Sequence, residues 1–185
     1  LEEVGVKTER GFIEVDDQMR TSVPGVYAVG DVTGKLLLAH VAFAQGVAAA
    51  ETAAGLETYP LSYSDMPRAV YCQPQVAGFG LTEAQAREQG FNVQTGHFPF
   101  RGSGKAIAIG DYEGFVKLIT DGESGDILGA AMIGPDVTEL LAELGVVKLL
   151  EGTPTEIGLA VHAHPTLSEA VKEAALAVSN EAIHI

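Results

Sequence analysis

The first third of the chain has an apolar pattern typical of an α/β fold. Residues 12–15 (Phe-Ile-Glu-Val) and 26–29 (Val-Tyr-Ala-Val) are short apolar runs bounded by turn-forming residues, which predicts two strands. From about residue 39 to residue 54 the chain is rich in alanine, so a helix is expected there, and Gly55 is expected to end it. A strand, a loop and a helix in this order indicate a partial α/β unit.

The remaining residues alternate between strand patterns and helix patterns. Strands are expected at residues 68–72, 76–81, 91–98, 115–120 and 127–133. Helices are expected after the capping box that begins at Thr82, from Asp136 to Glu151, after Thr153-Pro154, and over residues 167–178. A short polar turn joins the last two strands, which favours an antiparallel hairpin. The fold class predicted for this part is therefore α+β, with an antiparallel sheet flanked by helices.

A change of composition between these parts indicates a domain boundary. The segment 57–67 contains two prolines, two serines and two tyrosines, and it separates the Ala-rich helix from the first strand of the second part. We therefore expect one domain over residues 1–60 and another over residues 61–185. The chain opens on Leu1 rather than on methionine, so we expect a piece of a longer protein, whose targeting segment would lie upstream.

Composition and charge exclude several classes of function. The 11 Lys and Arg residues face 25 Asp and Glu residues, and the resulting net charge of −14 disfavours nucleic acid and anionic membranes as partners. No apolar run approaches the roughly 18 to 20 residues that cross a bilayer. A single cysteine provides neither an internal disulfide, nor a two-thiol redox centre, nor a thiolate metal cluster, and no metal site is expected.

The pair Gly30-Asp31 is the first candidate for chemistry. An apolar strand that ends there brings a carboxylate to the carboxyl edge of a sheet, where ligands of α/β folds bind. A carboxylate at this edge can accept a hydrogen bond from a sugar or polyol hydroxyl, and the glycine lets a ligand approach the backbone. Glycine and aspartate are also common turn formers, so a plain chain reversal remains open.

The stretch from Thr21 to Asp31 resembles the second flavin-binding motif of flavoproteins with two dinucleotide-binding domains. In that motif a threonine precedes an apolar strand that ends in Ala-x-Gly-Asp. The resemblance implies that the first domain is part of an FAD-binding domain and that Asp31, with Gly30, binds the ribityl chain of FAD. It also places four residues beside the isoalloxazine ring: Leu37, Leu38, Ala39 and His40. The start of the following helix would favour negative charge on a reduced flavin.

The second candidate is the segment His162-Ala163-His164-Pro165-Thr166-Leu167-Ser168-Glu169. The spacing of Thr166 and Glu169 is that of a capping box, in which Glu169 reaches back to the Thr166 N–H. The same carboxylate is also within sequence reach of His164, and a histidine held by a carboxylate is a suitable general base near neutral pH. Spacing alone leaves both interpretations open.

This segment resembles the C-terminal signature of the dihydrolipoamide dehydrogenases, within the pyridine nucleotide-disulfide oxidoreductases. Further similarity covers residues 68–71, 73–77, 97–100, 128–130 and 133–135. The resemblance implies that the second domain is the dimerisation domain, that His164 is the acid/base for the lipoyl thiol, and that Glu169 orients it. Leu167 and His162 favour this group over glutathione-reductase-like enzymes, which carry a related motif.

Several other residues receive an expectation of their own. The resemblance places Tyr71 near the substrate entrance, although a half-buried strand tyrosine explains it equally well. His162 is expected to be structural or to help shape the thiol channel. Cys72 is expected to be a buried, inert thiol, because it has no resolving partner. His97 and His184 are expected to be surface or structural residues.

The function implied by the resemblance is that of a flavin disulfide oxidoreductase, which oxidises dihydrolipoamide with NAD. The redox cysteine pair and the nicotinamide domain of such enzymes lie outside these residues, so the isolated chain is expected to be inactive. Implied partners are a second copy of the chain, in a homodimer, and dihydrolipoamide on a 2-oxo acid dehydrogenase complex. Localisation is expected in the bacterial cytoplasm, or else in the mitochondrial matrix. The alternatives are a non-catalytic dimerisation module and a glutathione-reductase-like reductase.

The helices expected over residues 137–150 and 167–178 have apolar residues that suit either a dimer interface or the core. The first has apolar residues at positions 140, 141, 144, 147, 149 and 150. Such a face can form a subunit interface, and it can equally pack onto the sheet of its own domain. The sequence pattern does not separate these two uses.

Overall fold

The computed structural model describes residues 1–184, and the contacts within it divide the chain into two units. The first unit is Leu1–Tyr63 and the second begins at Ser64. The first contains the short 3-10 helices η1 (Glu2–Val4) and η2 (Gly30–Thr33), the strands β1 (Thr8–Glu9) and β2 (Phe12–Ile13), and the helix α1 (Ala39–Ala53). The Ala-rich pattern therefore predicted α1 correctly, and Gly55, with φ 74°, follows its end.

One expected strand of the first unit is not formed. Residues 26–29 make only an isolated antiparallel bridge between Tyr27 and Arg20. Two backbone hydrogen bonds accompany it, from Thr21 N to Val26 O and from Ala28 N to Met19 O. A strand needs a neighbour along its length, and the apolar pattern of these residues does not supply one. The prediction of a strand at residues 26–29 was therefore wrong.

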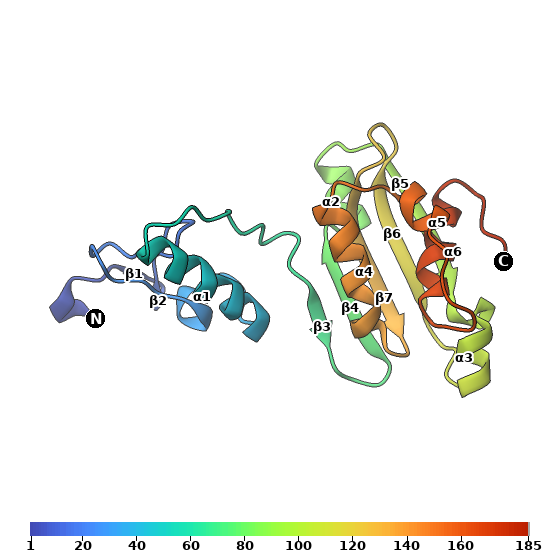
Figure 1. The fold of residues 1–185 in the computed structure, drawn as a ribbon, viewed down its shortest axis with the longest axis horizontal. Coiled ribbons are helices and arrows are strands. Elements are labelled where there is room, and N and C mark those ends of the chain that lie inside the picture. The colour runs from blue at the N-terminus through green and yellow to red at the C-terminus, as the bar shows by residue number, and fades with distance from the viewer. Residues whose placement is uncertain (185) are drawn as a thin grey trace. The chain divides into compact units, whose positions relative to one another are not determined.

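The second unit is built around an antiparallel sheet with strand order β3-β4-β7-β6-β5 (Figure 1). The strands are β3 (Arg68–Val70), β4 (Gln75–Gly80), β5 (Val93–Pro99), β6 (Phe115–Asp121) and β7 (Ile127–Gly134). All neighbouring strands run antiparallel, and β6 and β7 form the expected hairpin. The α+β prediction, with an antiparallel sheet flanked by helices, is confirmed.

Helices α2 (Glu83–Glu88), α3 (Gly104–Ile109), α4 (Val137–Leu149), α5 (Pro154–Leu159) and α6 (Glu169–Val178) complete the second unit. The capping box predicted at Thr82 is formed, because Thr82 N donates to Gln85 Oε1 over 3.0 Å and Thr82 Oγ1 accepts from Gln85 N over 3.3 Å. Asp136 precedes α4 as expected, but its side chain makes no capping hydrogen bond. Its backbone is left-handed, with φ 47°, rather than in the extended conformation of a side-chain cap.

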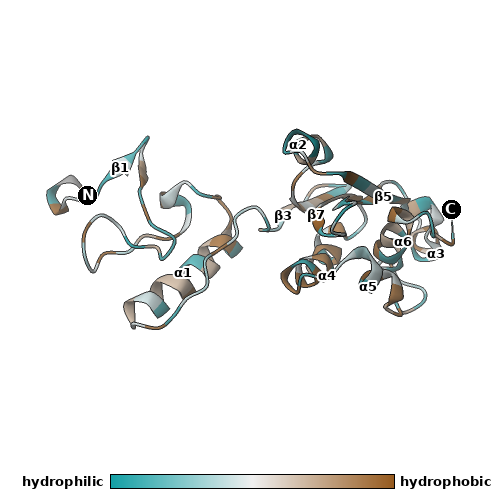
Figure 2. Cartoon of the chain, turned by 90° about the horizontal axis from the view of Figure 1, so that it is seen from above, coloured by the Kyte–Doolittle hydropathy of each residue, from teal (hydrophilic) through white to brown (hydrophobic). Residues whose placement is uncertain are grey.

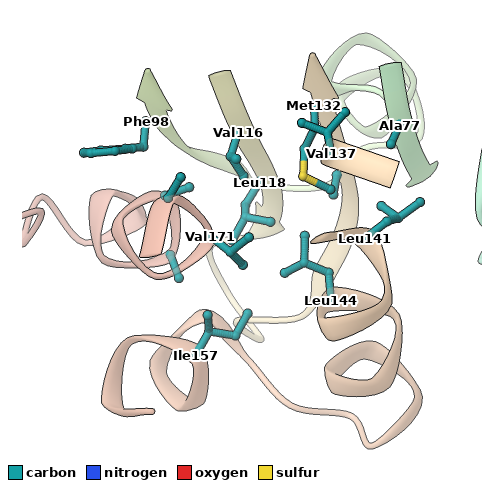
Figure 3. Packing of buried hydrophobic residues seen from close by; sticks show 14 of the residues in the cluster. Ala77, Phe98, Val116, Leu118, Met132, Val137, Leu141, Leu144, Ile157 and Val171 are labelled. Atoms are coloured by element: carbon teal, nitrogen blue, oxygen red, sulfur yellow. The ribbon is translucent and has the colours of Figure 1, made fainter. Parts of the chain in front are cut away.

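Helices α4 and α6 cover one face of the sheet and enclose the main hydrophobic core (Figure 3). From α4, Val137, Leu141 and Leu144 point toward Met132 and Ala77 of the sheet, and Val171 of α6 lies near Leu118. The core residues labelled in Figure 3 are Ala77, Phe98, Val116, Leu118, Met132, Val137, Leu141, Leu144, Ile157 and Val171. Burial of each large apolar side chain contributes about 1.5–3 kcal/mol. This core therefore fixes α6, and the residues at its N-terminus, on the sheet.

The apolar face expected on the helix after Asp136 is only partly used in this core. Leu141 and Leu144 are buried, whereas the side chains of Leu149 and Leu150 are 81% and 74% exposed. The helix ends at Leu149, two residues before the expected end, so these leucines stand at its solvent-facing terminus. Hydrophobic residues on α4 are brown in Figure 2.

Two observations concern membranes and metals. Within residues 1–184, no helix combines the length and the hydropathy that a membrane span requires. In the same part of the chain, the His, Cys, Asp and Glu side chains form no group of three or more that is arranged to hold a metal ion.

Candidate functional site

The candidate acid–base site lies where the loop after α5 meets the first turn of α6. Helix α6 packs on β5 and β6, and its backbone passes directly over Gly96 of β5. A Cβ at residue 96 would overlap the backbone oxygen of Ala174, so only glycine lets the helix lie this close. The strand thus sets the position of α6, and α6 carries Glu169 as its first residue.

Glu169 makes both of the contacts that its spacing allowed. Its Oε2 accepts a hydrogen bond from the backbone N–H of Thr166 over 2.8 Å, as in a capping box. Its Oε1 lies 2.8 Å from Nδ1 of His164. The Thr166 hydroxyl instead donates to the backbone oxygen of Ala163 over 2.7 Å, so the capping box is only half formed. One carboxylate therefore fixes the loop and orients the imidazole together.

The ring of His164 is accessible while its partner is shielded. The His164 side chain is 76% exposed, and that of Glu169 is 24% exposed. With Nδ1 directed to the carboxylate, an N–H at Nδ1 places the lone pair of the neutral ring on Nε2. Nε2 belongs to the accessible ring and can accept a proton from a molecule outside the unit. This is the geometry of a general base that is held by a carboxylate.

The electrostatics of Glu169 favour its ionised form. Partial burial raises the pKa of the carboxyl. The hydrogen bond from the Thr166 backbone lowers the pKa, and so do the hydrogen bond and the charge of His164, and together these effects outweigh burial. The pKa of Glu169 therefore lies below its ordinary value of 4.5. An ionised carboxylate near neutral pH accepts a hydrogen bond from Nδ1 and holds the imidazole ring in one orientation.

The neighbouring His162 is held from the other side of the loop. Its Nε2 lies 2.7 Å from Oε1 of Glu143 on α4, and its Nδ1 lies 3.1 Å from the backbone oxygen of Ala160. The His162 side chain is only 7% exposed. Lys172 of α6 also donates to Ala160 O over 3.0 Å. Nε2 of His162 thus attaches the loop to α4, and Nδ1 bonds to the end of α5 within the same segment.

The two shifted carboxyls of α6 predict an acid-sensitive second unit. Burial raises the pKa of Glu173 as well, but hydrogen bonds from His184 and Ile183 hold it below 4.5. Because both folded pKa values are lowered, the stability they add is present above about pH 4.5 and is lost as the pH falls through the lowered values. Urea unfolding between pH 7 and pH 2.5 is expected to show a flat stability that drops in the acid range.

Removal of either carboxyl should weaken that acid dependence. We expect Glu169→Gln and Glu173→Gln each to flatten the decline, because the amide does not titrate. Glu123→Gln, in the exposed turn between β6 and β7, is the matched control and should leave the profile unchanged. Equal slopes for all four proteins would contradict the contribution of these two carboxyls.

The candidate flavin residues lie together in the first unit. Gly30 and Asp31 form the start of η2, where Gly30 has φ 79° and a Cβ would contact Ala42 of α1. The Asp31 side chain is exposed, as are Ala39 and His40 in the first turn of α1. Leu37 is 59% exposed and Leu38 is half-buried at the N-cap of α1, where no side chain caps the helix.

A buried glutamine that sequence reasoning missed holds this turn. Gln45 of α1 accepts the Gly30 N–H on Oε1 over 2.6 Å and donates from Nε2 to the Tyr63 hydroxyl over 3.0 Å. The Thr33 hydroxyl donates to the Gly30 backbone oxygen over 2.8 Å. Both backbone polar groups of Gly30 are therefore bonded inside the unit, and the Asp31 carboxylate is presented outward from a fixed turn.

Gln45→Met is expected to loosen this turn. The thioether fills a similar volume but leaves the buried Gly30 N–H without its acceptor, which costs about 1–3 kcal/mol. Hydrogen exchange of the Gly30 amide should accelerate by roughly one to two orders of magnitude. Gln18→Met, at a half-buried position outside this network, is the control. An unchanged Gly30 amide in Gln45→Met would contradict the assignment of Gln45 as its support.

Comparison with known proteins identifies both units. Residues 66–175 match the model of the pyridine nucleotide-disulphide oxidoreductase dimerisation domain, and residues 1–46 match the pyridine nucleotide-disulphide oxidoreductase model. The chain belongs to the pyridine nucleotide-disulphide oxidoreductase family. Within this family, the second unit is the dimerisation domain, and the first is a short segment of the preceding oxidoreductase domain.

Dihydrolipoyl dehydrogenases are among the proteins to which the chain is similar. The chain is 52% identical over 188 residues to that of Corynebacterium glutamicum, covering all of this chain and 40% of the relative. It is 47% identical to that of Bacillus subtilis over 184 residues, covering all of this chain and 39% of the relative. The crystal structure of LpdA from Mycobacterium tuberculosis superposes with a TM-score of 0.88 at 30% identity, covering 94% of this chain and 38% of that one. The chain thus corresponds to the C-terminal portion of dihydrolipoyl dehydrogenase and spans about two-fifths of the length of these relatives.

In the second unit, Tyr71 and the His164–Glu169 pair lie at opposite edges of the sheet. Tyr71 follows the edge strand β3, whereas α6 packs at the opposite edge, on β5 and β6. The Tyr71 side chain is 80% exposed rather than half-buried. Cys72 is also exposed, with Sγ 3.0 Å from the backbone oxygen of Pro74. The expectation of a buried thiol was therefore wrong, because the chain leaves the sheet after Val70 and both residues lie in the connecting loop.

The remaining histidines have structural or surface surroundings. His97 is exposed on β5, and its ring lies 4.9 Å from that of Phe115. His184 lies near the end of the chain, with Nδ1 2.8 Å from Oε1 of Glu173. Sequence reasoning missed the partners Glu143 and Glu173. They stand 19 and 11 residues from their histidines, and no local motif links residues at those separations.

Proposed function

We propose that this chain is the C-terminal part of a dihydrolipoyl dehydrogenase, in which it supplies the His164–Glu169 acid–base pair and the dimer interface. The observation that carries the proposal is the 2.8 Å contact between His164 Nδ1 and Glu169 Oε1, on a ring that is 76% exposed. It occurs in a chain that is about half identical to dihydrolipoyl dehydrogenases over its full length. The proposed reaction is the oxidation of dihydrolipoamide with NAD.

In the proposed mechanism, His164 accepts a proton from a thiol of dihydrolipoamide. A free thiol has a pKa of about 8.5 and is weakly nucleophilic until it is ionised. Transfer of its proton to Nε2 gives a thiolate, and Glu169 stabilises the imidazolium that forms. The thiolate attacks a disulfide of the enzyme, forms a mixed disulfide and releases one cysteine thiolate. The second lipoyl thiol then closes the lipoamide ring and leaves the enzyme pair as a dithiol. Two electrons have moved from substrate to enzyme.

The disulfide that is attacked cannot come from this chain alone. Cys72 is the single cysteine, and it lies at the other edge of the sheet from α6. We infer that the redox pair lies in the part of the enzyme outside these residues and that the neighbouring subunit presents it. In this arrangement the exposed face of His164 is the face that meets the partner.

The first unit has features that fit FAD. Asp31 offers an exposed carboxylate beside a fixed turn, and Leu37 offers exposed apolar surface before the uncapped start of α1. Carboxylates bind the hydroxyls of a ribityl chain, and a helix start favours an electron-rich ring. We propose that Gly30 and Asp31 hold the ribityl chain and that Leu37, Leu38, Ala39 and His40 border the ring. When bound, FAD supplies the electron transfer between the dithiol and NAD.

The proposed homodimer is supported by an apolar surface beside the acid–base site. The Glu143–His162 contact brings the segment after α5 against α4. The exposed apolar side chains of these elements are Val146, Leu149, Leu150, Leu159 and Val161, of which Val161 is 96% exposed. Exposed apolar surface of this kind is typical of a protein interface. The net charge of −14 further suits attraction to a basic domain of a 2-oxo acid dehydrogenase complex.

A chimera tests this function. Residues 1–185 replace the matching C-terminal segment of the Bacillus subtilis dihydrolipoyl dehydrogenase, to which they are 47% identical. The chimera is expected to bind FAD, to form a dimer and to oxidise dihydrolipoamide with NAD at a rate within about tenfold of the parent, because the two segments are 47% identical over the full length of this chain. Selective turnover of glutathione disulfide would favour a glutathione-reductase-like enzyme. A dimer without any disulfide reductase activity would indicate a non-catalytic module.

A further inference from the structure

The loop between α5 and α6 is held on both sides of the candidate acid–base residue. After His164, the carboxylate of Glu169 accepts the Thr166 N–H and contacts the His164 ring. Before His164, the loop is held by His162, whose side chain is only 7% exposed. The two histidines are two residues apart, so their Cα atoms lie within about 7 Å of each other. A displacement of His162 is therefore transmitted to His164 over one intervening residue.

The contact that holds His162 comes from Glu143 of α4. Glu143 Oε1 lies 2.7 Å from Nε2 of His162, and a carboxylate oxygen only accepts, so the ring nitrogen donates. Glu143 and Glu169 stand on different helices with different supports. Helix α4 packs on β4 and β7, whereas α6 packs on α5, β5 and β6. The Glu143–His162 hydrogen bond thus joins these two groups of helices at the loop that carries His164.

The burial of His162 makes the loss of this hydrogen bond unfavourable. A buried N–H without an acceptor has given up its hydrogen bonds to water and gained none in the protein. Without the Glu143 oxygen, the His162 ring must move toward water to regain a partner. Nδ1 of the ring and Nζ of Lys172 on α6 both contact the backbone oxygen of Ala160, so neither contact joins the loop to α4. Glu143 is therefore the residue that fixes the loop on the α4 side.

We propose that Glu143, acting through His162, is a positioning residue for the His164–Glu169 pair. Its hydrogen bond holds the loop so that the His164 ring stays beside Glu169 and presents Nε2 outward. Glu143 acts from α4 and takes no part in the proton transfer itself. This inference rests on the proposed function of His164.

A contact at the start of α3 reports the position of the His164 ring. A Cβ at residue 104 would lie 4.0 Å from Cε1 of His164. A Gly104 Hα and the ring Hε1 should therefore give a nuclear Overhauser signal in the full chain. We expect Glu143→Gln to retain it, because the amide oxygen still accepts from His162, and Glu143→Leu to lose it. Glu139→Leu makes the same change at an exposed residue one turn earlier on α4 and should leave the signal unchanged.

Reduction of the chimera by dihydrolipoamide tests the consequence for the reaction. Glu143→Leu is expected to slow this step about tenfold, because the proton acceptor is displaced, and to leave reduction by NADH unchanged. Glu143→Gln should keep most of the rate. The double variant Glu143→Leu with His162→Leu should lose no more than His162→Leu alone, because Glu143 acts only through that ring.

The outcomes separate this inference from the proposed function. Amide spectra verify that each variant is folded, and Glu143→Ala, which removes the acceptor without apolar bulk, replaces any leucine variant that is not. A retained Gly104–His164 signal or an unchanged dihydrolipoamide rate after loss of the acceptor would overturn the inference. Equal slowing of the NADH route would also overturn it, because the effect would then be a general loss of structure. Full activity of His164→Gln would instead contradict the proposed function.

Discussion

His164→Gln in the chimera is expected to lower dihydrolipoamide turnover by about 10²- to 10⁴-fold, the usual contribution of a positioned general base. Glutamine preserves the volume and polarity of the side chain but accepts no proton from a thiol. Because the His164 ring is 76% exposed, the substitution should leave folding and dimer formation intact. The measurement is steady-state reduction of NAD by dihydrolipoamide, with size-exclusion chromatography to verify the dimer.

Two companion variants define the origin of that loss. Glu169→Gln leaves the histidine in place but removes the ionised partner, so a smaller loss is expected, at about 10- to 100-fold. His97→Gln, which removes an exposed histidine from β5, should have no effect. Transfer of electrons from NADH to an artificial dye requires no thiol deprotonation and should survive in all three variants. Wild-type thiol turnover in His164→Gln would remove the proposed role of this residue.

Gly96→Ala is expected to destabilise the second unit by about 3 kcal/mol, near the upper end of overpacking effects. The added methyl group overlaps the Ala174 backbone oxygen, and a backbone atom within a packed helix cannot rotate away as a flexible side chain would. Helix α6 must therefore shift from β5, and Glu169 shifts with it. Chemical denaturation of the second unit, followed by circular dichroism, measures the loss.

Gly145→Ala is the matched control within the same unit. Residue 145 lies in α4, where a Cβ would meet no heavy atom within 4 Å. The substitution should stabilise the unit by about 0.5–1 kcal/mol, because alanine favours a helix more than glycine does. Equal stabilities of Gly96→Ala and the wild type would show that α6 does not depend on the close approach at Gly96.

Local signals in the sequence predicted most of the second unit. Apolar runs bounded by turns identified all five strands of its sheet, with ends that differ from the observed ones by at most two residues. The capping box at Thr82 was visible because both partners lie within three residues of each other, and Pro154 marked the start of α5. These features depend on neighbouring residues, which is why one sequence sufficed.

The errors arose where distant residues decide the structure. Helix α3 was not predicted, although Ser103 caps it by accepting the Ala106 N–H over 3.3 Å. Its six residues are too few for a helical periodicity to stand out. Residues 26–29 have the apolar composition of a strand, but only Tyr27 pairs with another residue. Cysteine is usually a buried residue type, but Cys72 lies in an exposed loop. Pairing and burial are properties of the surroundings that a short pattern does not contain.

For the candidate sites, too, the sequence predicted contacts between near neighbours and missed those between distant residues. The contact of His164 with Glu169 was anticipated from a separation of five residues and from a motif resemblance. The residues that hold the candidate sites of the two units were not anticipated: Gln45 in the first unit, and Glu143 and Glu173 in the second, reach partners 11 to 19 residues away. The structure thus adds to the motif the contacts that hold its loop and its helix in place.

The most direct test of the central claim is a single-turnover comparison of two routes into the same chimera. Anaerobic mixing measures how fast dihydrolipoamide, and separately NADH, reduces the wild type and His164→Gln. If His164 is the base for the lipoyl thiol, the substitution slows reduction by dihydrolipoamide at least about 100-fold and leaves reduction by NADH unchanged. Equal slowing of both routes, or of neither, would contradict the assignment.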